Sequence, residues 1–417
     1  MDRRASMTHQ RGQTLMLMAV AVFLMVLLLI AATRMGEHAR RQWYMQSVAD
    51  NAAHSGAVLM ARQLNLSAIL NRALIGNQVA MGQWVGLASW MAMITRFGKN
   101  ASWVIGLIPG LQAAAIKLNS IVGKAEQMTD KSVQVLLYFH SGVIKAISLA
   151  QVGLETSMIV ETPFSVHKVI EQHDEKLEAS LYQGGSIAPF PGLWWRFTDS
   201  HSTRNKKSSE FFKQLTLKSR DPFTTRRTYR WGSIKLLKLE KAGGNELQSM
   251  PGGRWNWNAL DSLAVHAYLP NPLGWGWEVV KAAGWGARAA YSKYRRSRWY
   301  HKSYGNAFKV NKWVSRTGWN AMRSFRVQTL PFSYLRLREG NPYGAHAIVV
   351  KISDPETQQV THARAEVHFS RPLSIFPRGD RKQEKANLFN ALWEPKLVPL
   401  TATDKVTIAA REIVIDD

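Results

Sequence analysis

The longest uninterrupted apolar run of the chain lies close to its start. Leu15 to Ala32 are 18 consecutive apolar residues, and no charged residue lies between Gly12 and Thr33. As a helix this run would be about 27 Å long, close to the thickness of the hydrocarbon core of a bilayer. A signal peptide usually has a shorter apolar region, of roughly 7–15 residues, followed by a small-x-small cleavage site. No clear site of that kind follows Ala32, so the pattern favours a permanent membrane anchor over residues 14–33, with a signal peptide as the alternative.

A stripe of small residues follows the apolar run. Its members recur at i, i+3, i+4, i+7 and i+8, which places them on one face of a helix. No proline interrupts residues 14–95, so we expect the membrane helix to continue into this segment. Small side chains let another helix approach closely, so the stripe predicts lateral packing against partner helices. It consists of Ala49, Ala52, Ala53, Gly56 and Ala57.

Two further apolar segments, residues 79–94 and 101–116, raise the question of additional membrane spans. Each is 16 residues long, which is short for a span. The first contains Gln83 and the second contains Pro109. Their pattern favours helices that are buried or that lie against a membrane, while insertion as a hairpin stays open.

The pattern up to residue 184 is also helical. Apolar residues at helical spacing run over residues 111–160 without a proline. Thr162 followed by Pro163 is typical of the start of a helix, which we expect to end at the glycine pair 184–185. That helix would bury Val166, Ile170, Leu177 and Leu181.

Short alternating runs replace helical spacing beyond residue 185. Residues 234–248 are predicted to form a hairpin that turns on Gly243-Gly244-Asn245. Residues 346–352 and 361–369 predict two paired strands, and residues 405–415 predict another.

These patterns together predict an α+β fold. A single N-terminal transmembrane helix would continue into a long-helix region, and a β-rich C-terminal domain would follow. The expected divisions are residues 1–13 before the membrane, 14–33 within it, 34–184 for the helical region and 185–417 for the β-rich, basic, Trp-rich domain.

Charge adds a clue about partners. The net charge is +25 at pH 7, and there is no cysteine, which excludes disulfides and thiolate metal sites. Residues 204–241 contain 12 Lys/Arg against three acidic residues, and residues 281–338 contain 14 Lys/Arg and no acidic residue. Such surfaces attract polyanions: nucleic acid, anionic lipid headgroups or acidic proteins.

The second basic block also carries 12 aromatic residues. Cations beside aromatic rings suit a membrane interface, a docked partner or single-stranded nucleic acid. The plain alternative is that the aromatic rings belong to the core and the cations are solvated. We favour a membrane-apposed or partner-binding surface over nucleic-acid binding. The candidate surface consists of Arg295, Arg296, Arg298, Trp299, Tyr300, Lys302, Lys312 and Trp313.

The sequence lacks the common motifs of catalysis and cofactor binding. It contains no P-loop, no G-x-S-x-G and no H-E-x-x-H. His362, Glu366 and His368 would share one face of a strand, and imidazole with carboxylate suits a metal. Arg364 lies in the same row and would repel a cation, so we interpret the row as the polar face of a half-buried strand. The sequence predicts no enzyme, no cofactor and no metal ligands.

Two parts of the sequence resemble a known family. "RGQTLMLMAVAVFLMVLLLIAATRMG", followed by "MQSVADNAAHSGA", resembles the span and helix of the TadE/TadG-like proteins of tight-adherence (Flp-type) pili. "SRDPFTTRRTYRW" and "EKANLFNALWEPKLVPLT" resemble the body of bacterial TadG-like pilus-assembly proteins.

The resemblance implies a non-enzymatic, single-pass protein of the bacterial inner membrane that serves pilus biogenesis and surface adhesion. Its N-terminus would be cytoplasmic and its bulk periplasmic; the charges do not decide this, because three arginines flank each side of the span. Partners would be other pilus-assembly or pilin-like proteins, bound through the N-terminal helix, with anionic lipid headgroups as a further contact. The alternative is a membrane-tethered protein that binds polyanions such as single-stranded nucleic acid.

One position departs from the cleaved members of this family. Pilin-like members have a glutamate five residues after a glycine, in a prepilin-peptidase site. Here Leu17 lies five residues after Gly12. A glutamate in an apolar run needs a partner, and leucine cannot make that pairing. The chain is therefore expected to stay uncleaved, as a TadG-type assembly accessory or minor pilin-like component.

Overall fold

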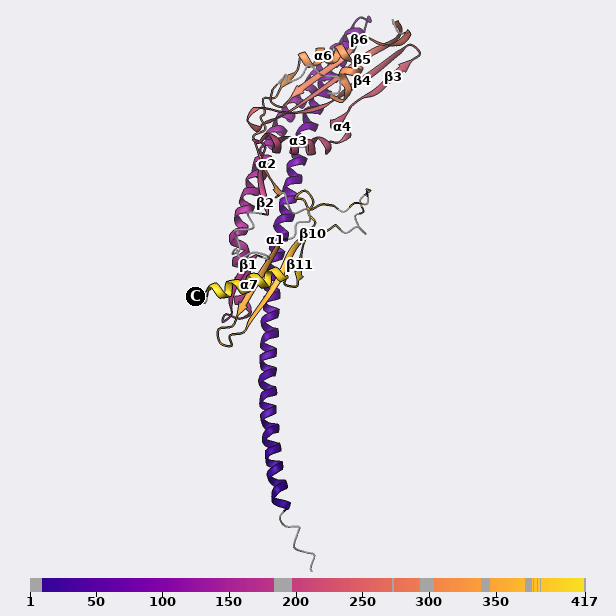
Figure 1. Ribbon diagram of the computed structural model, residues 1–417. Coiled ribbons are helices and arrows are strands. Elements are labelled where there is room, and N and C mark those ends of the chain that lie inside the picture. The colour runs from indigo at the N-terminus through magenta and orange to yellow at the C-terminus, as the bar shows by residue number, and fades with distance from the viewer. Residues whose placement is uncertain are drawn as a thin grey trace, which may run out of the picture.

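The computed structural model is a long helical rod with strands packed along one end of it (Figure 1). The fold is α+β, as the sequence predicted. The structure describes residues 10–183, 197–271, 274–292, 304–338, 346–371 and 384–415, together with residues 377, 379, 380 and 382.

Two antiparallel helices build the rod. Helix α1 (Gln10–Gly106) has 97 residues and is therefore roughly 145 Å long at about 1.5 Å per residue. The apolar run thus continues into the body without a break, as expected. A turn containing Pro109 reverses the chain, because proline lacks the backbone N–H that a continuing helix needs. Helix α2 (Gln112–His173) then returns beside α1.

The strands form three sheets. The basal sheet, nearer the N-terminal end of α1, has the order β1-β9-β10-β11 and is antiparallel. It consists of β1 (Glu178–Gln183), β9 (His346–Ser353), β10 (Val360–Phe369) and β11 (Trp393–Val398). A two-stranded sheet pairs β2 (Thr198–Ser202) with β8 (Ser333–Leu337).

The distal sheet lies near the far end of the helical pair and has the order β3-β4-β5-β6-β7. Its strands are β3 (Tyr229–Ile234), β4 (Leu237–Ser249), β5 (Trp255–Asn271), β6 (Gly274–Ala289) and β7 (Arg323–Ser324). The short helices are α3 (Lys206–Lys218), α4 (Pro222–Thr225), α5 (Ala307–Val310), α6 (Lys312–Asn320) and α7 (Ala402–Ile415), with 3-10 turns at Pro251–Gly253 and Tyr304–Asn306.

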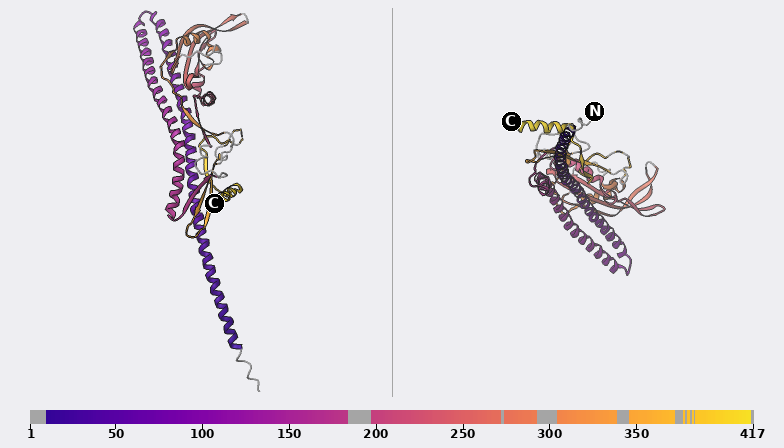
Figure 2. Two further views of the ribbon diagram at one scale, coloured as in Figure 1. Left: turned by 60° about the vertical axis from the view of Figure 1, so that its left-hand side comes forward. Right: turned by 90° about the horizontal axis from the view of Figure 1, so that it is seen from below.

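The basal and distal sheets pack on α1 at different levels, so α1 lies between α2 and most of the strands (Figure 2). Strand β8 of the two-stranded sheet also packs against α2. The basal core joins α1 to β9, β10 and the end of α2. The distal core joins α1 and α2 to Trp255 and Trp257 of β5. Helix α2 ends at His173 and β1 begins at Glu178, so the change from helices to strands comes before the predicted boundary near residue 185. Both cores combine α1 with strands from beyond that boundary.

The strand predictions had mixed outcomes. Strands β9 and β10 confirm the predicted pair. The hairpin predicted on Gly243-Gly244-Asn245 is wrong, because β4 runs straight through these residues and the turn lies between Ile234 and Leu237. A side chain at Gly244 would lie 2.6 Å from the backbone nitrogen of Gly305. The glycine is needed because the 3-10 turn at Tyr304–Asn306 packs closely on β4, and not for a turn in β4 itself.

Two helix predictions also need correction. Helix α2 continues through Thr162 and Pro163 to His173 and does not start there. The predicted helix end at residues 184–185 is also wrong: Leu177 is buried as expected but lies beyond the helix, and Leu181 lies half-buried in β1. The strand predicted at residues 405–415 is instead helix α7.

The start of α7 explains why this segment is helical. The hydroxyl of Thr401 accepts from the backbone N–H of Asp404, and the Asp404 carboxylate accepts from the N–H of Thr401 at 2.8 Å. This reciprocal capping satisfies two donors at the helix start and outweighs the alternating pattern that follows.

Candidate interaction surfaces

The N-terminal part of α1 is the clearest candidate for contact with a membrane. Its large apolar side chains are exposed: the exposed fraction is 70% for both Leu17 and Leu28. None of the best 18-residue window is buried, and this helix is long and apolar enough to cross a membrane. Exposed apolar surface of this extent is unfavourable in water, which is consistent with a membrane anchor.

Ion pairs and a hydrogen bond join α1 to the rest of the body about two to three turns beyond Thr33, at about 3.6 residues per turn. Arg41 of α1 pairs with Asp354 at 2.8 Å and with Asp174 at 3.0 Å. Tyr44 donates its hydroxyl proton to the carbonyl of His173, at the end of α2, over 2.7 Å. These contacts fix the lower end of α2 to α1 about 16 Å beyond Thr33, at 1.5 Å per residue.

The small-residue stripe packs closely, as predicted, but it packs against the chain itself. Ala49, Ala52, Ala53 and Ala57 are each 0% exposed, in the basal core. A side chain at Gly56 would lie 2.9 Å from Val166 and 3.0 Å from Ile348. The expectation that this stripe contacts partner helices is therefore corrected, because the folded chain already covers it.

The segment 79–94 is a buried part of α1, as favoured from its sequence. Met81, Val85 and Met93 are completely buried, so this segment does not face lipid. The segment 101–116 covers the end of α1, the turn and the start of α2, and here Trp103 is 67% exposed and Leu107 is 64% exposed. This apolar tip lies roughly 105 Å along α1 from Thr33, at about 1.5 Å per residue.

Most of the candidate basic surface falls outside the described residues: Arg295, Arg296, Arg298, Trp299, Tyr300 and Lys302 lie in the undescribed range 293–303. Lys312 and Trp313 lie on α6, where both are exposed and Trp313 is 47% exposed.

Other members of the basic block are structural. Arg288 is 4% exposed and pairs with Glu126 at 2.6 Å and with Asp130 at 2.8 Å, which ties β6 to α2. Trp285 packs under the guanidinium of Arg96, 4.6 Å from the ring centre. The second basic block thus supplies both core contacts and surface charge. The alternative that its aromatic rings belong to the core holds for part of it.

The row on β10 behaves as a half-buried polar face. Ala363, Ala365 and Val367 point into the basal core, while His362, Glu366 and His368 lie on the other side. Arg364 in the same row pairs with Asp404 at 3.2 Å and lies 3.6 Å from Glu366. Among the described residues no group of three His, Asp or Glu side chains could hold a metal ion.

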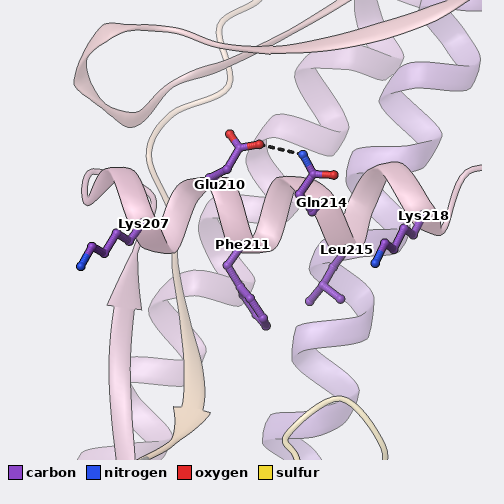
Figure 3. Close-up of a pocket in the computed structure, with 6 residues that line it drawn as sticks. All are labelled: Lys207, Glu210, Phe211, Gln214, Leu215 and Lys218. Atoms are coloured by element: carbon purple, nitrogen blue, oxygen red, sulfur yellow. Dashed lines mark hydrogen bonds between the residues drawn. The ribbon is translucent and has the colours of Figure 1, made fainter.

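A shallow hollow of about 390 Å³ lies along α3 (Figure 3). Phe211 and Leu215 project from one face of the helix, and Lys207 and Lys218 lie toward its ends. Glu210 accepts from Gln214 at 2.7 Å, and this hydrogen bond is the main reason why its pKa is lowered. The hollow offers an apolar surface with charged edges, and its lining lacks a nucleophile paired with a base.

A cluster of buried charges lies inside the distal core, and sequence reasoning did not predict it. Asp261 is completely buried and holds Arg227 through two bonds of 2.9 and 2.8 Å, and Lys241 through one of 2.5 Å. Burial alone would raise the pKa of Asp261, but the charges of Arg227 and Lys241 outweigh it and lower that pKa to about 2. Burial lowers the pKa of Lys241 to about 8.

This charged cluster also contacts the helical rod. Arg227 donates to the side-chain oxygen of Asn245 at 2.6 Å, and Asn245 donates to the carbonyl of Gly82 in α1. Through Asn245, the buried cluster links the distal sheet to α1. The sequence signal for it was Asp261 itself, the one charged residue of strand β5, which lies between Leu260 and Leu263.

No protein-family model, no curated protein and no solved structure matches this chain.

Proposed function

We propose that this protein is a non-enzymatic, membrane-anchored component of a Tad/Flp-type pilus assembly machinery. In this proposal α1 crosses the bacterial inner membrane once, residues 1–13 are cytoplasmic and the body stands in the periplasm. The protein acts as an assembly accessory or minor pilin-like component in pilus biogenesis and surface adhesion.

The observation that carries the proposal is the continuity of α1. One helix leads from an exposed apolar segment directly into two buried cores, so the body is held rigidly to its anchor. A flexible linker would tether a domain, whereas an unbroken helix fixes its height and orientation. Such a rod is suited to positioning partners at a set distance from a membrane, which is a scaffold's task and not a catalyst's.

The sequence resemblance selects the pilus machinery among possible scaffolds. The phrases that resemble TadG-like proteins lie in ordered parts of the body: one covers α4 and β3, and the other leads into β11. Leu17, in the exposed part of α1, leaves no carboxylate for the pairing that pilin subunits use. This supports a protein that stays in the membrane instead of forming the shaft.

Topology and function are tested separately. The natural chain has no cysteine, so a single introduced cysteine reports its own location. In intact cells with a permeable outer membrane, a membrane-impermeant maleimide should label Gly36→Cys and not Ser6→Cys. Labelling of Ser6→Cys alone would overturn the orientation.

The role in pili is tested by deleting the gene in the producing bacterium and counting pili by electron microscopy. We expect pili and surface attachment to be lost and to return with the full chain, but not with a chain that lacks residues 15–32. Unchanged piliation in the deletion strain would contradict the proposal.

A further inference from the structure

The outward face of α2 carries a heptad pattern, and its a and d positions are called the seam below. Between Leu111 and Val160, apolar or small residues recur with alternating steps of three and four residues, which is the a/d pattern of a heptad repeat. All seven charged residues of this segment lie outside the seam. The a positions are Leu111, Leu118, Ala125, Ser132, Phe139, Ala146, Gly153 and Val160; the d positions are Ala114, Ile121, Met128, Val135, Gly142, Leu149 and Thr156.

The fold leaves this seam uncovered by the described residues. Met128 and Val160 are each 71% exposed, and Ile121, Val135 and Leu149 are 56, 67 and 64% exposed. The opposite face of α2 is occupied, because Val133, Leu137 and Ile144 are buried in the distal core. The helix therefore uses one face for its own fold and presents a second apolar face, with a period of 3.5 residues, to the outside.

In the upright arrangement of the proposed function, lipid of the anchoring membrane does not reach this face. The lower end of α2 is fixed beside Tyr44, beyond the apolar run of α1, and α2 extends from there toward the tip. A sustained heptad period is also a feature of helix pairing and not of a lipid-facing helix, which has no need of a 3.5-residue repeat.

The charges beside the seam favour a second copy in parallel orientation. Lys117, Lys124, Lys131 and Lys145 occupy one flank, the g positions. The other flank, the e positions, carries uncharged residues such as Val122, Thr129, Leu136 and Val143. In a parallel pair each lysine would lie beside an uncharged e position, and its aliphatic stem can cover apolar surface. An antiparallel pair would bring lysines together.

Two copies anchored in one membrane are parallel by construction. The seam is about 75 Å long at 1.5 Å per residue, and a helix is about 10 Å wide, so each partner would bury roughly 750 Å². The total, roughly 1,500 Å², is in the range of stable protein interfaces.

We infer that this protein forms a parallel homodimer through the a/d seam of α2. The inference rests on the membrane anchor of the proposed function for its orientation, and it does not depend on a role in pili. The small residues Ala125, Gly142 and Gly153 would let the helices approach closely between the larger contacts.

Single cysteines in the full-length, membrane-bound protein test this arrangement. Under mild oxidation, Ile121→Cys and Leu149→Cys should each give a disulfide-linked dimer, because equivalent d positions face each other in a parallel pair. Ser120→Cys and Glu161→Cys are matched controls, since these exposed residues lie off the seam; they should stay monomeric.

The outcomes separate the alternatives. Dimers from both seam cysteines, with monomers from both controls, support the inference. A link that forms only when Ile121→Cys and Leu149→Cys proteins are mixed would show an antiparallel pair and overturn it, as would equal linking of all four variants or none.

A charge test uses the detergent-solubilised full chain. The double variant Val135→Glu/Leu149→Glu should be monomeric by light scattering with unchanged helical circular dichroism, while Ser120→Glu stays dimeric. A wild-type mass of one chain, or a dimer that survives the double variant, would also overturn the inference. Each readout stands even if deletion of the gene leaves pili unchanged.

Discussion

At the level of single residues, the carboxylate of Asp261 holds two cations in the distal core. Asp261→Asn would leave Arg227 and Lys241 buried without a counter-charge, which typically costs about 3–5 kcal/mol of unfolding free energy. Lys241→Met removes one of two cations and keeps the two bonds between Arg227 and Asp261, so it should cost little at pH 7. Chemical denaturation of both variants in detergent measures the difference.

Lys241 also sets a pH dependence. Because burial lowers its pKa to about 8, the unfolded chain holds a proton between pH 8 and 10.5 that the folded chain has released. The contribution of this group to the unfolding free energy therefore rises with pH across that window. Lys241→Met should remove the rise; if it proved as harmful as Asp261→Asn at pH 7, the lysine would be a required partner.

His346 predicts a loss of stability on the acid side. It is 3% exposed in β9, its ring stacks on Phe197, and burial lowers its pKa to about 4. As the pH falls below 6.5 the unfolded chain takes up a proton that the folded chain excludes, so stability falls by about 2 kcal/mol by pH 5. His346→Phe should reduce the drop in melting temperature between pH 7 and pH 5. His54→Gln, at an exposed histidine, should leave that drop unchanged.

Gly56 shows how the stripe in α1 should be tested now that its surroundings are known. A leucine there would meet Val166 and Ile348 and overpack the basal core, at about 1–3 kcal/mol. Thermal unfolding of Gly56→Leu should fall by several degrees, whereas His54→Leu, exposed two residues earlier, should not. Equal stability of the two variants would mean that the stripe faces a looser environment than the basal core.

At the level of elements, the local sequence pattern predicted correctly those segments in which the spacing of apolar residues matches the side that the fold buries. Strands β9 and β10 alternate because one face meets the core, and the apolar run of α1 is a helix whatever surrounds it. The hairpin at Gly243-Gly244 could not be predicted correctly, since the reason for its glycines is the backbone of Gly305, distant in sequence. Pro163 similarly stays within α2 because tertiary packing of Val166 and Ile170 outweighs one lost hydrogen bond.

The candidate surfaces divide in the same way. The sequence was enough to predict that the apolar run is exposed. It could not show what packs against the small-residue stripe, because a face of small residues fits the chain's own sheet as well as a partner helix. The heptad pattern of the seam can be found in the sequence of residues 111–160 alone. Only the structure shows which of the two apolar faces of α2 the fold uses.

Strand β6 depends on glycine for its contact with α1. A side chain at Gly286 would lie 2.6 Å from the backbone nitrogen of Met93 and also meet the carbonyl of Ser89. Gly286→Ala should therefore push the distal sheet from the helix and cost about 3 kcal/mol or more. Gly232→Ala, in β3 with open space around it, is the matched control. Limited proteolysis should cut the distal sheet faster in the first variant and not in the second.

At the level of the whole molecule, α1 passes through both cores, so the two sheets and the exposed apolar segment share one rigid axis. The helical and β-rich regions predicted from composition are thus two layers of one rod. With α1 anchored as proposed, the height of any part of the body above the membrane would follow from residue number along α1.

That relation gives a direct test of an upright rod against a body that lies on the membrane. Leu107 at the tip lies roughly 110 Å along α1 from Thr33, far beyond the reach of lipid if α1 stays unbroken. A fluorophore on Leu107→Cys should show no energy transfer to acceptor-labelled lipids in reconstituted vesicles, while one on Met35→Cys should show strong transfer. The alternative is that the exposed apolar side chains of Trp103 and Leu107 insert into the same bilayer. In that case energy transfer would be strong at both labelled positions. That result would require α1 to bend between its apolar run and the basal core, and the fixed height on which the scaffold proposal depends would be lost.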